Sequence, residues 1–308
     1  MSQVQTLAAA PVAEQTFVQA WSALCKPRIT AMVGFAAFVG GLLAAGSGAN
    51  LLSLAEACGY IGLVGMASSV FNQLLERDTD ARMVRTARRP LVTGRVRARD
   101  AVWAGALLTA AGVLGLALRF NTLVALLTLA TMVAYVLVYT PLKRFSSLNT
   151  AVGAIPGAMP PLLGFVAVTG EASGWAWYLF AILFAWQFPH LLAIAWLYRE
   201  DYARAGLKML PALPRTEGMA GRQALLYSLA LLPVSLLPAL RGDAGWLYVA
   251  AALLFGVAYT VASALFALRE TRSRARAVLI VSLVYLPALY SLTLMDPLVR
   301  AFGARGSL

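Results

Sequence analysis

The sequence predicts an all-α polytopic membrane protein with nine transmembrane helices around a central cavity. Hydrophobic residues make up 60% of the 308 positions and charged residues 12%, and the mean hydropathy is +0.75. This composition is typical of integral membrane proteins. The apolar residues also fall into nine runs close to the ~20 residues that a membrane-spanning helix needs. Because these runs lack the period-two alternation of a membrane β-barrel, we expect helices.

In chain order, the predicted transmembrane helices cover residues 29–46, 51–75, 101–118, 122–139, 148–168, 175–198, 223–240, 246–268 and 277–295. Most connecting segments are short, so consecutive helices should be antiparallel neighbours. We expect a cytoplasmic tail at 1–28, partly disordered and with Trp21 near the membrane interface. A single transmembrane domain should cover 29–296, and a short tail at 297–308 should lie on the other side.

The basic residues predict the orientation of the helices. With nine spans, 21 of the 25 lysines and arginines lie in the N-terminal tail and in every second loop. The other four are Arg119, Arg241, Arg300 and Arg305. The positive-inside rule therefore places the N-terminus in the cytoplasm and the C-terminus across the membrane. Topology and anionic lipid headgroups account for the net charge of +12, so we expect membrane lipid as a partner and no nucleic acid.

Two polar loops, four helices apart, hold seven of the thirteen acidic residues. Residues 77–82 can be aligned with residues 199–204 at an offset of 122 residues, which places Asp80 over Tyr202. This similarity indicates two four-helix pseudo-repeats followed by a ninth helix, with both polar segments at the mouth of the cavity. The alternative is a chance similarity between two basic loops.

The first polar segment carries three oxygen-bearing side chains at a spacing of four. Asn72, Glu76 and Asp80 should share one helix face, whereas Asp78 should point away from it. Carboxylate and amide oxygens suit Mg²⁺, which typically uses one or two carboxylates together with substrate phosphates. The spacing therefore predicts a metal site at Asn72, Glu76 and Asp80.

Several arginines come shortly after Asp80 in the sequence. Arg85, Arg88 and Arg89 can bind phosphate oxygens bidentately and stabilise a departing diphosphate. The alternative is a solvated, ion-paired loop that serves only the topology. That alternative explains the arginines but not the polar Asn72, which lies deeper in the span.

The second polar segment follows a helix that contains the only histidine. Gln187 and His190 share a face of this helix, and Pro189 lies between them. Polar side chains inside a membrane are costly and usually face a cavity or a partner. Three roles fit His190: a ligand of haem iron, a general base, or a donor that orients a substrate. A structural histidine with a satisfied hydrogen bond is the alternative.

The pattern Asn-x-x-x-Glu-x-x-x-Asp-x-x-Met-x-Arg-Thr-x-x-Arg-Pro-Leu at 72–91 resembles the signature of the UbiA-type intramembrane prenyltransferases. The resemblance is strongest to the haem branch of the family, the protohaem IX farnesyltransferases or haem O synthases. Further motifs that fit this branch lie at 26–28, 139–144, 156–161, 186–190 and 198–202. Motifs thus cover roughly residues 26–211, and the last three helices resemble the family in hydropathy only.

This resemblance implies transfer of a farnesyl group from farnesyl diphosphate to the 2-vinyl group of haem B. Water adds in the same reaction, which yields haem O and diphosphate. Haem B is then a substrate, Mg²⁺ is the cofactor, and the active site faces the cytoplasmic side of the cell inner membrane. A downstream haem-modifying enzyme is a further candidate partner.

The resemblance also implies roles for individual residues. Asn72, Glu76 and Asp80 would hold Mg²⁺ with the diphosphate, and Arg85, Arg89 and His190 would be catalytic. The residues expected to bind substrate are Arg88, Lys143, Gln187, Tyr198, Tyr202 and Lys208, with Lys143 and Lys208 helping to neutralise the leaving group.

Three other functions compete with this interpretation. Quinone-type relatives carry a second Asp-x-x-x-Asp motif, whose positions fall on Tyr198 and Tyr202 here, so an acceptor such as 4-hydroxybenzoate is the runner-up. A CDP-alcohol phosphotransferase would need an Asp-x-x-Asp-Gly pattern, which the two polar segments lack. A transporter would place polar residues near the midplane of several helices, whereas here they gather at one surface.

Overall fold

The computed structural model describes residues 16–305, and it describes the side chains of residues 16–296 except Ser47. Residues 1–15 and 306–308, which belong to the two predicted tails, lie outside this range. Every regular element in the described range is a helix. Nine helices of this range are long and apolar enough to cross a membrane, so the predicted all-α fold with nine spans is confirmed.

The helices of the first half are α2 (Pro27–Ala45), α3 (Leu51–Leu75), α5 (Ala98–Arg119) and a composite fourth span made of α6 (Thr122–Val133), the π-helix η2 (Ala134–Tyr139) and α7 (Thr140–Leu142). Those of the second half are α8 (Asn149–Thr169), α9 (Trp175–Leu197), α11 (Met219–Leu240) and α12 (Trp246–Leu268), followed by α13 (Arg272–Arg305). Five short helices complete the chain: α1 (Phe17–Cys25), η1 (Gly46–Gly48), α4 (Arg77–Asp80), α10 (Arg199–Arg204) and η3 (Leu210–Ala212).

The predicted helix boundaries agree with the structure to within a few residues, except in the last helix. The first span begins at Pro27 rather than at residue 29, because proline is well suited to the first position of a helix. The last helix runs from Arg272 to Arg305 and so continues through most of the predicted C-terminal tail. The fourth span contains a π-helix, which the sequence analysis did not predict.

The predicted N-terminal tail contains a helix, α1. Thr16 and Gln19 form a capping box, in which each side chain accepts a hydrogen bond from the backbone N–H of the other residue. Ala20 and Leu24 are buried on the side of α1 that faces α3. The helix ends at Lys26, whose left-handed backbone (φ 50°) turns the chain directly into α2.

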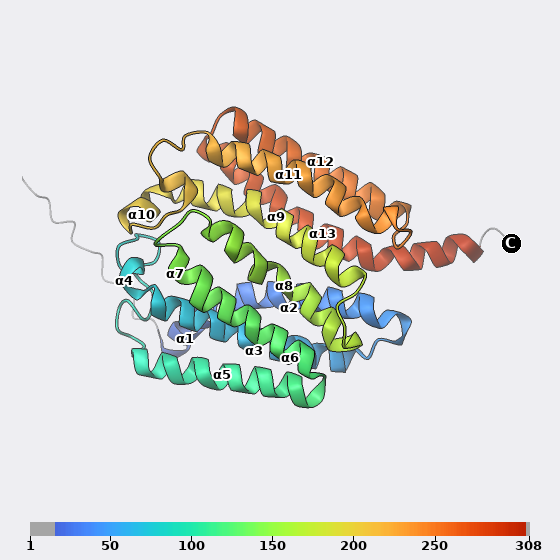
Figure 1. Cartoon of the computed structure of the whole chain (residues 1–308), viewed down its shortest axis with the longest axis horizontal. Coiled ribbons are helices and arrows are strands. Elements are labelled where there is room, and N and C mark those ends of the chain that lie inside the picture. The colour runs from blue at the N-terminus through green and yellow to red at the C-terminus, as the bar shows by residue number, and fades with distance from the viewer. Residues whose placement is uncertain (1–15, 306–308) are drawn as a thin grey trace, which may run out of the picture.

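The two halves of the bundle repeat the same arrangement. Helix α3 ends at Leu75 and α4 begins at Arg77, while α9 ends at Leu197 and α10 begins at Arg199. These positions differ by the predicted offset of 122 residues. The helices α2, α3, α5 and α6 contact one another in sequence order, as do α8, α9, α11 and α12. Figure 1 shows α4 and α10 at the same end of the bundle.

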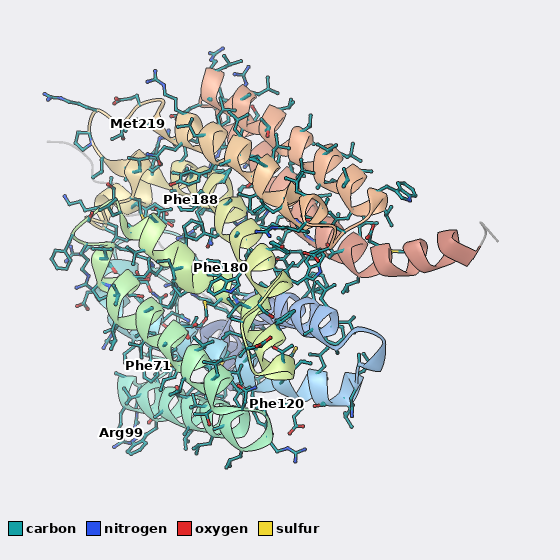
Figure 2. All side chains as sticks on the ribbon, turned by 45° about the vertical axis from the view of Figure 1, so that its right-hand side comes forward. Phe71, Arg99, Phe120, Phe180, Phe188 and Met219 are labelled. Atoms are coloured by element: carbon teal, nitrogen blue, oxygen red, sulfur yellow. The ribbon has the colours of Figure 1, made fainter. Side chains whose placement is uncertain are left out.

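Helices α8 and α9 are the most buried of the nine spans. Where α2 crosses α8, a Cβ atom on Gly40 would overlap the backbone of Pro161, and one on Gly164 would overlap that of Ala37. The two helices therefore touch backbone to backbone. The outer surface of the bundle carries many exposed apolar side chains, among them Leu118, Leu240 and Leu268. Figure 2 shows side chains projecting from all sides of the bundle.

Candidate active site

A charged cavity lies at the end of the bundle where α3 passes into α4. Its volume is about 430 Å³. Seven of the predicted site residues line it: Asn72, Glu76, Asp80, Arg85, Arg89, Lys143 and Tyr202. Residues that the sequence analysis did not select also line it, among them Lys26, Thr86, Tyr135 and Tyr139. The structure thus brings both polar segments to one cavity.

Asn72, Glu76 and Asp80 share one face because hydrogen bonding continues from α3 into α4. The backbone N–H of Glu76 donates to the carbonyl of Asn72 (2.9 Å), and that of Asp80 donates to the carbonyl of Glu76 (2.7 Å). The spacing of four is therefore kept, although the backbone of Glu76 leaves helical geometry (φ −92°, ψ 4°). Asp78 is exposed, as its helical phase predicts.

The side chain of Asn72 is fixed by the fourth span. Its Nδ2 donates to Thr140 Oγ1 (3.0 Å), and Thr140 Oγ1 donates to the carbonyl of Tyr135 (2.9 Å) in the π-helix. Since the amide nitrogen is used in this way, the amide oxygen remains as the acceptor that Asn72 can offer to the cavity.

Two ion pairs connect the carboxylates to basic residues. Lys143 Nζ lies 2.9 Å from Glu76 Oε1, and both side chains are largely buried. Arg89 forms an ion pair with Asp80 through Oδ2. The other carboxylate oxygen of Asp80, Oδ1, is buried and has no hydrogen-bond partner. Burial raises the pKa of Asp80, although the neighbouring Arg89 opposes this shift.

This donor set fits a hard cation such as Mg²⁺. Glu76 and Asp80 supply carboxylates, Asn72 supplies an amide oxygen, and Oδ1 of Asp80 is a buried acceptor without a partner. Within residues 16–305, no three His, Cys, Asp or Glu side chains form a group able to enclose a metal. A cation here would therefore depend on oxygen atoms of a bound substrate, which is the usual arrangement for Mg²⁺ with phosphates.

Four basic residues line the cavity against two carboxylates, so it suits an anion: Lys26, Arg85, Arg89 and Lys143. Lys26 reaches it from the left-handed turn between α1 and α2. Burial, reinforced by the charges of Arg89 and Lys143, lowers the pKa of Lys26 to about 8. The ammonium of Lys143 also lies over the ring of Tyr139, 4.4 Å from its centroid.

Arg85 joins the first polar segment to the second. Its guanidinium lies over the ring of Tyr198, 4.4 Å from the centroid, and its Nη2 donates to the hydroxyl of Tyr202 (3.0 Å). Its backbone N–H donates to Oδ2 of the buried Asp201 (3.4 Å), which also pairs with Arg204. Tyr198 and Tyr202 thus hold an arginine at the positions that correspond to Glu76 and Asp80.

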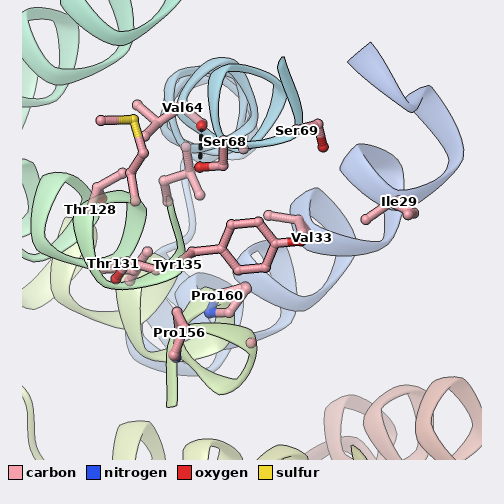
Figure 3. A pocket seen from close by; sticks show the side chains of 15 residues that line it. Ile29, Val33, Val64, Ser68, Ser69, Thr128, Thr131, Tyr135, Pro156 and Pro160 are labelled. Carbon is pink, nitrogen blue, oxygen red and sulfur yellow. Dashed lines mark hydrogen bonds between the residues drawn. The ribbon is translucent and has the colours of Figure 1, made fainter. Parts of the chain in front are cut away.

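A second, apolar cavity of about 240 Å³ lies deeper in the bundle, between α2, α3, α6, η2 and α8. Figure 3 shows Tyr135, Val33 and Pro160 together at its wall. The hydroxyl of Ser68, also in this wall, is satisfied by the carbonyl of Val64 (2.8 Å). Ile29 and Tyr135 line both cavities, so the charged and the apolar spaces adjoin.

Five predicted site residues do not line the charged cavity. Tyr198 contacts Arg85, which does line it. Arg88 and Lys208 are exposed. Gln187 is buried and its Nε2 donates to the carbonyl of Ala154 on α8 (2.8 Å). His190 is on α9, and its Nδ1 lies 2.8 Å from Ser282 Oγ on α13. Functions for these five residues remain predictions.

Lys26, Tyr135 and Tyr139 line the cavity but were not among the predicted site residues, and they differ in whether a sequence pattern points to them. Lys26 and Tyr139 belong to motifs that support the family resemblance, and the basic Lys26 lies directly before an apolar span. Tyr135 gave no such signal, because its position depends on the π-helix that carries it.

The amino-acid sequence is similar to those of known prenyltransferases. Residues 33–285 match the UbiA prenyltransferase family. A protoheme IX farnesyltransferase from Solibacter usitatus is 44% identical over 89% of this chain and 97% of its own length. A protoheme IX farnesyltransferase from Koribacter versatilis is 40% identical over 96% and 98%.

Solved structures share the fold at low sequence identity. The apo structure of a UbiA homolog from Aeropyrum pernix K1 has a TM-score of 0.70 at 22% identity, over 85% of this chain and 97% of that one. A UbiA homolog from Archaeoglobus fulgidus bound to DMAPP and Mg²⁺ has a TM-score of 0.63 at 17% identity, over 89% and 99%. The predicted family is therefore confirmed: the chain belongs to the UbiA prenyltransferase family.

Proposed function

We propose that the protein transfers the farnesyl group of farnesyl diphosphate to the 2-vinyl group of haem B and adds water, which yields haem O and diphosphate. The observation that carries this proposal is the contact between the two cavities. The charged cavity suits the diphosphate, the apolar cavity suits the farnesyl chain, and Ile29 and Tyr135 mark their boundary. The relatives described above bear the name protoheme IX farnesyltransferase.

The reaction begins when the bond between C1 and oxygen of farnesyl diphosphate breaks and the diphosphate leaves with the electron pair. Lys26, Arg85, Arg89 and Lys143 stabilise the negative charge on the leaving group. The terminal carbon of the haem vinyl group then bonds to C1, which leaves a cation at the vinyl carbon next to the macrocycle. A water oxygen bonds to that carbon and loses a proton, giving the hydroxyethyl farnesyl side chain.

The apolar cavity protects the allylic cation from water until the vinyl group attacks it. Asn72, Glu76 and Asp80 would hold a Mg²⁺ ion, which supplies charge neutralisation for the diphosphate oxygens. The buried Oδ1 of Asp80 supports this assignment, because an unpaired carboxylate oxygen is costly unless a cation or donor binds it.

We also propose where the protein lies in the cell and how it is oriented in the membrane. Basic loops alternate along the nine spans, so the N-terminus and the charged cavity face the cytoplasm and the C-terminus lies across the membrane. The membrane is the cell inner membrane, and the product passes to a haem-modifying enzyme.

The test is a prenyl-transfer assay with the purified protein, Mg²⁺ and labelled farnesyl diphosphate. We expect label in haem O when haem B is the acceptor, and none when 4-hydroxybenzoate is offered instead. Label only in a benzoate product would replace the haem assignment by the quinone-type alternative. Omission of Mg²⁺ with a chelator should abolish transfer to haem B.

A further inference from the structure

We propose that Nε2 of His190 binds the iron of the haem acceptor, and that Ser282 is the positioning residue that keeps this nitrogen free. The inference rests on the proposed function, since it takes haem as the acceptor. It deepens that function by assigning the contact that fixes the macrocycle before the vinyl group reacts.

Contacts on two sides hold the imidazole of His190 in one orientation. Its ring stacks on that of Trp186, with a centroid distance of 4.9 Å and an interplanar angle of 21°. Its Nδ1 lies 2.8 Å from Ser282 Oγ on α13. Trp186 is itself fixed, because its Nε1 donates to the carbonyl of Ser282 (2.9 Å) and its own carbonyl accepts from the hydroxyl of Tyr259 (3.0 Å).

The hydrogen bonds of Ser282 determine the tautomer of His190. Ser282 Oγ lies 2.7 Å from the carbonyl of Leu279, one turn earlier on α13. A helical serine commonly donates its single hydroxyl proton to such a carbonyl. Ser282 Oγ can then only accept from His190, so Nδ1 carries the proton. The lone pair of the neutral ring is consequently on Nε2.

Nε2 has no hydrogen-bond partner in the described part of the chain, whereas Nδ1 has one. His190 as a whole is partly exposed. A histidine that ligates a metal generally donates its other ring nitrogen to a fixed acceptor, which sets the tautomer and the ring orientation. The pair of His190 and Ser282 has this arrangement.

The position of His190 also suits the acceptor of the proposed reaction. It precedes Leu191, which lines the charged cavity. It lies two turns before Tyr198, roughly 12 Å along the helix axis from the mouth. Trp186, which stacks on its ring, belongs to the buried apolar cluster of the second half.

The single histidine of the chain permits a direct test on the unmodified protein. The full chain is purified through an affinity tag without histidine, after labelling with ¹⁵N-histidine. We expect NMR to report the Nδ1–H tautomer of the free protein. We expect ferric haem bound to the protein to show hyperfine coupling to ¹⁵N. The Nε2–H tautomer, or haem bound without ¹⁵N coupling, would overturn the inference.

Variants separate ligation from packing. His190→Ala should shift the Soret band of bound haem, and added imidazole should restore it. Ser282→Ala should weaken haem binding by about tenfold or more, as loss of an outer hydrogen-bond partner usually does, whereas Ser282→Thr should keep the affinity. Ser235→Ala is the matched control, because Ser235 is a buried serine bonded to Tyr285 on α13. An unchanged Soret band and affinity in His190→Ala would overturn the inference.

The outcomes also distinguish this inference from the proposed function. If the unmodified protein neither binds haem nor transfers farnesyl to it, both are wrong. If it transfers farnesyl to haem while His190→Ala keeps the same haem spectrum, only the ligation by His190 is wrong.

Discussion

The two halves of the bundle end their second long helix with the same backbone break but with different side chains. In the first half, Glu76 and Asp80 follow the break and lie with basic residues in the charged cavity. In the second half, the corresponding Tyr198 and Tyr202 hold the guanidinium of Arg85. The same backbone arrangement thus carries two carboxylates, which we propose as cation ligands, in the first half, whereas in the second half it carries two tyrosines that contact Arg85.

The largest effect should come from removing a carboxylate of the first half. Asp80→Asn keeps the shape of the side chain but removes its charge, so we expect turnover to fall by at least ~10²-fold with the fold retained. Steady-state assays and circular dichroism measure the two properties. Asp78→Asn is the matched control, because Asp78 is exposed on the same short helix. Near-normal turnover in Asp80→Asn would remove Asp80 from the site.

A smaller loss should follow from removing the buried ammonium of the first half. If Lys143 binds the diphosphate as proposed, Lys143→Gln removes a charged hydrogen bond worth about 2 kcal/mol, so the affinity for farnesyl diphosphate should fall roughly 30-fold. Equilibrium binding of the labelled diphosphate measures this. Arg144→Gln is the control, because Arg144 is exposed, does not line the cavity and uses its side chain to donate to the carbonyl of Leu75. Equal losses in both variants would contradict a specific role for Lys143.

The affinity for farnesyl diphosphate should also depend on pH through Lys26. Its pKa of about 8 lies below the ordinary value of 10.5, so the ammonium is lost as the pH rises through about 8. The Michaelis constant should then rise by up to about tenfold per pH unit. Between pH 8 and 10.5 the unfolded chain holds more protons at this residue, so its contribution to the stability of the fold should increase with pH. Lys26→Arg should flatten the affinity profile, and an identical slope in that variant would exclude Lys26.

The smallest effect should come from the second half. Tyr202→Phe removes the hydroxyl that accepts from Arg85 and keeps the ring, so we expect a loss of roughly threefold in kcat/KM. Tyr198→Phe should change little, because Tyr198 contacts Arg85 through its ring. If the two variants behave alike, the hydroxyl of Tyr202 does not position Arg85.

Much of the fold could be predicted because the membrane restricts the chain to helices of a fixed length. Hydropathy alone located nine spans, and the spacing of four correctly grouped Asn72, Glu76 and Asp80 on one face. The offset of 122 residues correctly related the two polar segments. Helix α1 could also have been found, since Thr16 and Gln19 have the spacing of a capping box.

The other features depend on tertiary contacts that no local pattern encodes. The π-helix, which brings Tyr135 and Tyr139 to the cavity, has no sequence signature comparable to a capping box. Lys26 lies at the cavity because its own backbone adopts the left-handed conformation, which is uncommon for a residue other than glycine. The position of His190 against Ser282 joins residues 92 apart in the chain. The family resemblance supplied site residues, but it did not indicate which of them share a cavity.

The contact between α2 and α8 has a mechanical consequence. Because Gly40 and Gly164 allow the two backbones to touch, these helices have no layer of side chains on which to slide or rock. A transporter that alternates its access would need such movement between its repeats. Because α2 and α8, the first helices of the two repeats, touch backbone to backbone, we expect them to stay fixed relative to each other during turnover. We then expect any movement during turnover in the polar segments at the mouth, where contacts such as those of Arg85 connect the two halves.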